Sequence, residues 1–71
     1  METILIHTDW IQLDQALKKE GIIGTGGEMA FFLENNAVLL NGKKVTEKRK
    51  KLYPGDYLLV QKKDYQIVRE I

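Results

Sequence analysis

The stretch Gly21-Ile22-Ile23-Gly24-Thr25-Gly26-Gly27-Glu28 decides the fold of this chain, because one helical pattern ends in it and a second begins after it. Gly21 stands where a glycine in the left-handed conformation commonly closes a helix. Thr25 is a suitable N-cap for the next helix, and Gly26 and Gly27 have no side chains to cover its first main-chain N–H groups. The stretch therefore predicts a joint between two helices, with N–H donors that attract anions.

The first helix is indicated by apolar residues that fall on one helical face. These residues are Trp10, Leu13, Ala16 and Leu17. Their spacing predicts a helix over residues 10–20, with Thr8 or Asp9 as its N-cap. The opposite face is polar, so the helix should lie at the surface with a buried stripe. Lys18 and Lys19 stand in its last turn, where positive charge complements the helix dipole.

The second helix is indicated by a shorter repeat of the same kind. Its apolar positions are Met29, Phe32 and Leu33. It should end at Asn35 or Asn36, because both tolerate the left-handed conformation that closes a helix. Helical spacing favours core packing over base stacking for Phe32 and leaves Phe31 open. The pair Ile22-Ile23 is expected to pack beneath the two helices.

Short β-rich segments occupy the rest of the chain. The expected strands cover residues 3–7, 38–40, 43–45, 57–61 and 65–69. Asn41-Gly42 fits a type I′ hairpin turn, Pro54-Gly55-Asp56 forms a second turn, and residues 62–64 turn the chain into the last strand. We therefore expect a single α+β domain over residues 1–71. Two N-terminal helices, in a helix-turn-helix-like arrangement, should pack on a small, mainly antiparallel β-sheet.

Several kinds of chemistry lack the residues that they need. Cysteine and serine are absent, and His7, the only histidine, is expected at the surface near a strand end. Gly21 and Gly26 have the spacing of a nucleotide-binding phosphate loop, but Gly27 and Glu28 stand where that loop requires Lys and then Ser or Thr. We therefore expect no catalytic residues, no metal site and no small-molecule cofactor.

The chain also lacks membrane signals. No apolar run approaches the roughly 20 residues of a membrane span. The N-terminus does not combine a charged region with an apolar one, as an export signal does. We expect a cytoplasmic monomer that does not bind membranes.

Positive charge is concentrated in one part of the sequence, although the whole chain carries only +1. Residues 43–51, which we call the basic segment, hold six basic residues and one acidic residue, Glu47. Their net charge of +5 leaves −4 for the rest of the chain. A concentrated basic segment on a mildly acidic body is typical of a protein that binds a polyanion. A solvated loop without a ligand is the alternative.

The order of the motifs resembles a known RNA-binding family. The motifs are residues 11–21 (Ile-Gln-Leu-Asp-Gln-Ala-Leu-Lys-Lys-Glu-Gly), Thr25-Gly26-Gly27, Phe32-Leu33, residues 38–42 (Val-Leu-Leu-Asn-Gly) and residues 51–56 (Lys-Leu-Tyr-Pro-Gly-Asp). Over residues 11–60 this order is similar to the domain named after ribosomal protein S-four, also called the αL motif. The stand-alone bacterial YaaA-type form of that domain is the nearer likeness.

The resemblance implies a module that binds structured ribosomal RNA and acts in ribosome assembly. It also implies that the two helices and the following hairpin face the RNA. The residues expected to contact RNA are Lys18, Lys19, Thr25, Gly26, Gly27, Lys43, Lys44, Lys48, Arg49, Lys50 and Lys51. A polyphosphate backbone contacted by lysines and a helix end is expected to be bound mainly by shape and charge, with counterion release giving a steep dependence on salt.

The sequence departs from the family pattern at three places. Gln12 stands where many members have a basic residue, and Ala30 stands where the YaaA type usually carries Lys. Glu47-Lys48-Arg49 replaces an expected Arg-Arg-Gly, so the positive charge is kept but shifted. The alternative that stays open is a β-grasp-like regulatory domain, or a protein-interaction domain whose basic segment docks an acidic partner.

Overall fold

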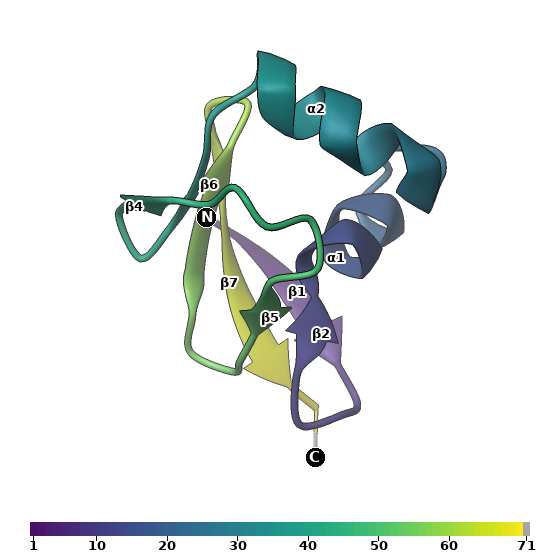
Figure 1. The fold of residues 1–71 in the computed structure, drawn as a ribbon. Coiled ribbons are helices and arrows are strands. Elements are labelled where there is room, and N and C mark those ends of the chain that lie inside the picture. Colours follow the sequence, from purple (N-terminus) through teal and green to yellow (C-terminus); the bar gives the residue numbers. More distant parts are fainter. Residues whose placement is uncertain (71) are drawn as a thin grey trace.

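A computed structural model describes residues 1–70 and shows a five-stranded sheet in the order β1-β7-β6-β3-β4 (Figure 1). The strands are β1 (Glu2–Ile6), β3 (Val38–Leu40), β4 (Lys43–Lys44), β6 (Tyr57–Val60) and β7 (Lys63–Arg69). Strands β1 and β7 are parallel, and the other neighbours are antiparallel. The sheet is therefore mixed, and with two short helices it confirms the expected α+β class.

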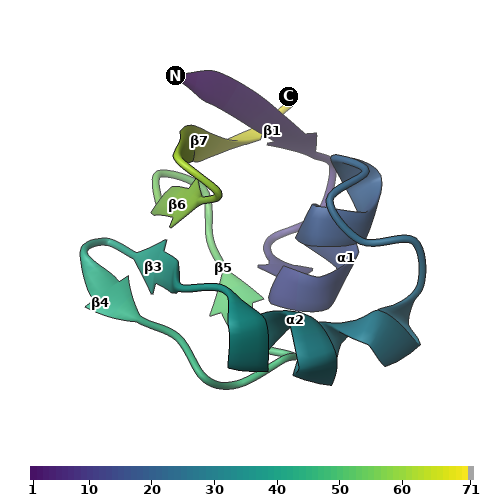
Figure 2. The same ribbon diagram turned by 90° about the horizontal axis from the view of Figure 1, so that it is seen from above.

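The helices lie on one side of this sheet, which curves around them (Figure 2). They are α1 (Leu13–Lys19), a 3₁₀ turn η1 (Gly26–Glu28) and α2 (Met29–Asn35). A second, two-stranded sheet pairs β2 (Ile11–Gln12) with β5 (Lys51–Leu52). Residues 20–25 connect α1 to η1, so the predicted joint separates two helical segments.

The core forms where alternating strand residues meet the apolar faces of the helices. In β1, β6 and β7 every second residue is buried, as expected for a sheet with one face covered. The buried side chains are Ile4, Ile6, Leu13, Ala16, Leu17, Ile23, Met29, Phe32, Val38, Val45, Leu52, Leu58, Val60, Tyr65 and Ile67. The core assignments of Phe32 and Ile23 are thus confirmed, and Phe31 is exposed over 70% of its surface.

Helix α1 begins three residues later than its apolar spacing predicts. Ile11 and Gln12 are extended because they pair with Leu52 and Lys51 of β5. Gln12 therefore occupies the N-cap position, and the prediction of Thr8 or Asp9 there was wrong. The Thr8 hydroxyl instead donates a hydrogen bond to the Trp10 carbonyl.

The end of α1 is the closing motif that the glycine predicts. Gly21 has a φ of 74°, in the left-handed region. The Ile22 N–H donates to the Leu17 carbonyl at 2.9 Å, and the Gly21 N–H donates to the Lys18 carbonyl at 3.1 Å. These two bonds make a Schellman motif.

Helix α2 ends at Asn35, as expected, but not in the left-handed conformation. Asn36 is extended, with a φ of −140°. The two asparagine side chains instead donate to the carbonyls of Phe31 and Phe32, at 2.8 and 3.1 Å. The last carbonyls of the helix thus accept hydrogen bonds from side-chain amides. In a helix closed by a left-handed residue, main-chain N–H groups would donate these bonds.

Both hairpins of the sheet are present. Asn41 and Gly42 have φ values of 51° and 84°, which confirms the predicted turn between β3 and β4. The turn between β6 and β7 differs from the prediction, because Gln61 and Lys62 form it and β7 begins at Lys63. Its two residues also have positive φ, 52° and 64°, without a glycine to mark the place.

Candidate functional site

The basic segment leaves the sheet at β4 and returns toward the helices as an ordered arm. Val45 is buried, and its N–H donates to the Val38 carbonyl at 2.8 Å. Further along, the Lys50 N–H donates to the Glu47 carbonyl at 3.2 Å and closes a turn. Lys48 and Arg49 therefore stand at the tip of a hydrogen-bonded turn.

The main chain of this arm is fastened to the beginning of α1. The Leu13 N–H donates to the Lys50 carbonyl at 2.8 Å, and the Asp14 N–H donates to the Lys48 carbonyl at 3.1 Å. The first N–H groups of a helix have no partner within the helix, so these carbonyls replace a side-chain cap. The side chains of Lys48, Arg49 and Lys50 are left exposed.

Lys51 is held differently from its neighbours. Its ammonium lies 4.5 Å from the centre of the Trp10 ring, within the range of a cation–π interaction. Its main chain pairs with Gln12, and Leu52 beside it is fully buried. Lys51 thus joins the exposed basic segment to the packed β2–β5 ladder.

No carboxylate forms an ion pair with the basic segment within residues 1–70. The ion pairs gather instead along β1, β7 and the segments next to them. They join Met1 with Asp64, His7 with Glu70, Lys63 with Glu2, and Arg69 with Asp9. No ion pair among residues 1–70 therefore neutralises the segment's charge of +5, although the carboxylates of Glu34, Glu47 and Asp56 line the hollows beside it. Its net positive potential extends into solvent.

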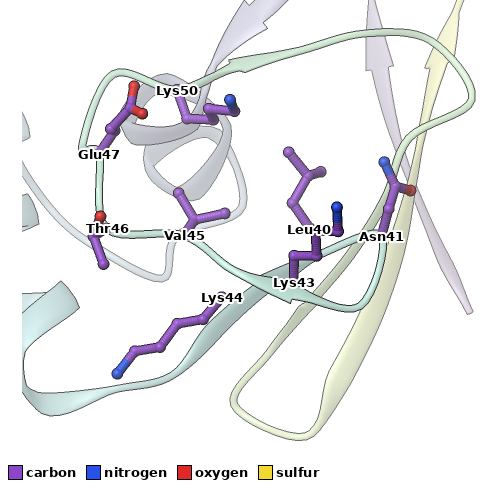
Figure 3. A pocket seen from close by; sticks show the side chains of 8 residues that line it. All are labelled: Leu40, Asn41, Lys43, Lys44, Val45, Thr46, Glu47 and Lys50. Atoms are coloured by element: carbon purple, nitrogen blue, oxygen red, sulfur yellow. The ribbon is translucent and has the colours of Figure 1, made fainter.

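The surface around the basic segment is shaped into shallow hollows. The first, of about 400 Å³, lies between the β3–β4 hairpin and the arm that carries Glu47 and Lys50 (Figure 3). Both Lys43 and Lys44 line this hollow, and the Lys44 side chain extends away from the hairpin. A second hollow brings Lys44 and Lys48 next to α2, which contributes Ala30, Leu33 and the acidic Glu34. The basic segment and the outer face of α2 therefore form one continuous surface.

The other predicted lysines lie elsewhere. The Lys19 ammonium donates to the Leu5 carbonyl of β1 at 2.6 Å, which ties it to the sheet edge. Lys18 is exposed in the last turn of α1. Neither lines the hollows around the basic segment, so the structure does not bring them together with it.

The predicted anion site at Thr25-Gly26-Gly27 has two carboxylates beside it. The Glu28 carboxylate accepts the Thr25 N–H at 3.1 Å. A Cβ placed on Gly26 would lie 3.9 Å from a carboxylate oxygen of Asp14. The spacing Thr25-x-x-Glu28 is the signature of a capping box, a local signal that was present in the sequence but not predicted. The N–H groups of Gly26 and Gly27 have no protein acceptor within residues 1–70.

One further group at this surface was missed. Tyr53 follows β5 and keeps 49% of its surface exposed. It lines a third hollow together with Arg49, Lys50 and Lys51. No periodic pattern marks Tyr53, and its exposure depends on the fold around it.

The remaining titratable groups with shifted pKa values lie in the sheet. The Tyr57 hydroxyl donates to Asp64 at 2.6 Å, and this bond raises the pKa of Tyr57 and lowers the pKa of Asp64. Burial raises the pKa of Tyr65. Residues 1–70 bring together no group of three or more potential metal-ligating side chains. None of their helices is long and apolar enough to cross a membrane.

This chain belongs to the S4 domain family, whose pattern matches residues 4–68. The match confirms the resemblance and extends it beyond residues 11–60, to the paired strands β1 and β7. A similar protein is the "Probable ribosome maturation protein RlbA" of Bacillus subtilis (strain 168). The two are 36% identical over 58 residues, which cover 82% of each chain.

Proposed function

We propose that this protein is a non-catalytic RNA-binding module that recognises structured ribosomal RNA during ribosome assembly. The observation that carries the proposal is the basic segment, which forms no ion pair within residues 1–70 and is fixed to α1 by its main chain. Family membership and the printed name of the Bacillus subtilis relative support it. On this proposal the protein acts as a cytoplasmic monomer, without a cofactor.

In this proposal the RNA backbone lies along the surface that the basic segment shares with α2. Lysine and arginine side chains neutralise its phosphates, and counterions are released from the RNA. The phosphate contacts come mainly from Lys43, Lys44, Lys48, Arg49 and Lys50, with Lys51 behind them on Trp10. A backbone held in place loses less conformational freedom on binding than a mobile loop would.

The helical joint has a positioning role in the proposal. Helices α1 and α2 act as the helix-turn-helix-like pair that faces the RNA. Thr25, Gly26 and Gly27 position the RNA on this pair. The free N–H groups of the two glycines can donate to a phosphate. The nearby carboxylates of Asp14 and Glu28 oppose that contact, so most attraction comes from the basic segment. Lys18 and Lys19 supply charge at the far end of α1.

Titration with ribosomal RNA across salt concentrations tests this proposal. If about four of the five basic side chains in residues 43–50 contact phosphates at once, log affinity against log salt should have a slope of roughly −3, on the coefficient for single strands. The variant Lys48→Gln/Arg49→Gln removes the two charges at the tip of the turn. Its slope should become shallower by about 1.4, and its affinity at low salt should fall.

A matched control removes the same amount of charge from another part of the surface. Lys62→Gln/Lys63→Gln changes Lys62 of the β6–β7 turn and Lys63, the first residue of β7, both outside the hollows of the basic segment. This variant should keep the slope of the wild type. Equal losses in both variants would mean that only net charge matters, and a slope near zero for the wild type would reject RNA binding through phosphates.

A cell lysate separates this proposal from docking on an acidic protein. Nuclease treatment should release the protein from large particles if RNA holds it there. Retention in the particles after complete digestion of the RNA would favour a protein partner.

A further inference from the structure

We propose that Tyr53 forms a stacking site for one unpaired nucleobase, next to the surface that binds the RNA backbone. This inference rests on the proposed RNA-binding function and adds the structural element that the protein recognises. The geometry joins an exposed aromatic ring and three consecutive cations, Arg49, Lys50 and Lys51, in one open hollow.

The exposed ring is carried by a rigid piece of main chain. The Tyr53 N–H donates to the Asp56 carboxylate at 2.8 Å, and the Asp56 N–H donates back to the Tyr53 carbonyl at 3.0 Å. The Gly55 N–H donates to the Ile67 carbonyl of β7 at 2.7 Å. Leu52, immediately before Tyr53, is fully buried. The turn is therefore fastened on both sides, and about half of the Tyr53 residue's surface still faces solvent.

The charges around the ring suit a nucleotide better than an apolar ligand. Arg49 and Lys50 can hold a phosphate in the hollow, and Lys51, whose ammonium lies over Trp10, adds positive charge behind them. Of the two carboxylates that line it, Asp56 already accepts hydrogen bonds from Asn41 and from the Tyr53 main chain. Glu47 is the other, and its charge disfavours a phosphate at its own edge of the hollow. A phosphate therefore binds best at Arg49 and Lys50, and the Tyr53 ring of the same hollow stays available to a base.

An unpaired base is the part of an RNA that can reach such a ring. Bases inside a helix already stack on their neighbours, whereas bases in loops and bulges can turn outward onto aromatic side chains. Tyrosine supplies a large contact area with few rotatable bonds, so ordering it costs little. The ring accepts any base by its face, so the site recognises the unpaired state and not the sequence.

The test uses two RNA hairpins that differ only by one bulged nucleotide, with fluorescent 2-aminopurine at the bulge. Wild type and Tyr53→Phe should bind the bulged hairpin and quench its fluorescence. Tyr53→Ala should bind it about 5- to 150-fold more weakly without quenching, the range expected for one lost stacking partner. Its affinity for the fully paired hairpin should change by less than about twofold. As a control, Tyr57→Ala removes an exposed ring from the sheet and should bind like wild type.

The outcomes distinguish failure of the Tyr53 stacking site from failure of the proposed RNA-binding function. If Tyr53→Ala binds both hairpins as the wild type does, or weakens on both equally, the stacking site is wrong and RNA binding stands. A Tyr53→Phe variant that behaves like Tyr53→Ala would show that the hydroxyl matters and would overturn stacking. If the wild type binds neither hairpin in a salt-dependent way, the proposed function fails and the inference fails with it.

Discussion

Replacing Lys51 by alanine should destabilise the domain, whereas the same change at Lys48 should not. Both side chains are exposed lysines of the basic segment. Lys51 alone places its ammonium over an aromatic ring, at 4.5 Å from the centre of Trp10. At an exposed site such an interaction contributes about 0.5–1 kcal/mol. For a domain of this size, 1 kcal/mol shifts the midpoint of thermal unfolding by about 4–8 °C, so Lys51→Ala should lower it by about 2–8 °C.

The single tryptophan makes the measurement direct. Trp10 is the only residue of its type, so its emission reports on this contact during thermal unfolding. Circular dichroism gives an independent midpoint. Lys51→Arg should preserve the midpoint, because a guanidinium also stacks on aromatic rings. Lys48→Ala should stay within the roughly 0.5 kcal/mol typical of surface substitutions.

Equal midpoints for Lys51→Ala and Lys48→Ala would refute this reasoning. The contact would then contribute nothing measurable, and Lys51 would be an ordinary solvated lysine. A lower midpoint in both variants would refute it in another way, because it would show that charge in this segment stabilises the fold generally.

Two further substitutions test polar contacts. Glu28→Gln should keep its bond to the Thr25 N–H and hence the unfolding midpoint. Because it removes a carboxylate that opposes a phosphate, the variant should bind RNA more tightly at low salt. Glu70→Gln should show no change in the same titration. Tyr57→Phe removes the bond that holds the pKa of Asp64 below its ordinary 3.8. That stabilisation is present above pH 3.8 and lost as pH falls through the lower folded pKa, so urea unfolding from pH 7 to 2 should show wild type and variant converging in acid. A difference that stays constant with pH would exclude Asp64 as its source.

The sequence predicted the turns and helix ends whose main-chain conformation only a few residue types adopt readily. Gly21 closes α1 with positive φ, and Asn41-Gly42 turns β3 into β4, both as predicted. The Gln61-Lys62 turn could not be located in this way, because neither glutamine nor lysine is a residue type that indicates positive φ. The start of α1 was misplaced because β2 forms only against β5, about forty residues away along the chain. Helical spacing contains no information about that pairing.

The basic segment was visible as charge, but its attachment was not. Which carbonyls cap α1 depends on where the chain returns after the β3–β4 hairpin. No local sequence pattern indicates that path. The capping role of Glu28 was a different kind of omission, since its spacing from Thr25 is a local signal. Tyr53 had no comparable signal, because an exposed tyrosine after a strand looks the same in sequence with or without a basic hollow beside it.

The manner of attachment explains how four consecutive cations can be held at one place in a folded domain. Repulsion among residues 48–51 would spread a free loop, since like charges favour extended chain. Here two of their carbonyls accept the first N–H groups of α1, and the last cation rests on Trp10 while its main chain joins the β2–β5 ladder. Main-chain carbonyl groups thus hold the segment in place, whereas side-chain ammonium and guanidinium groups carry its charge. A side-chain substitution at Lys48, Arg49 or Lys50 can therefore change binding without removing a contact that holds the segment.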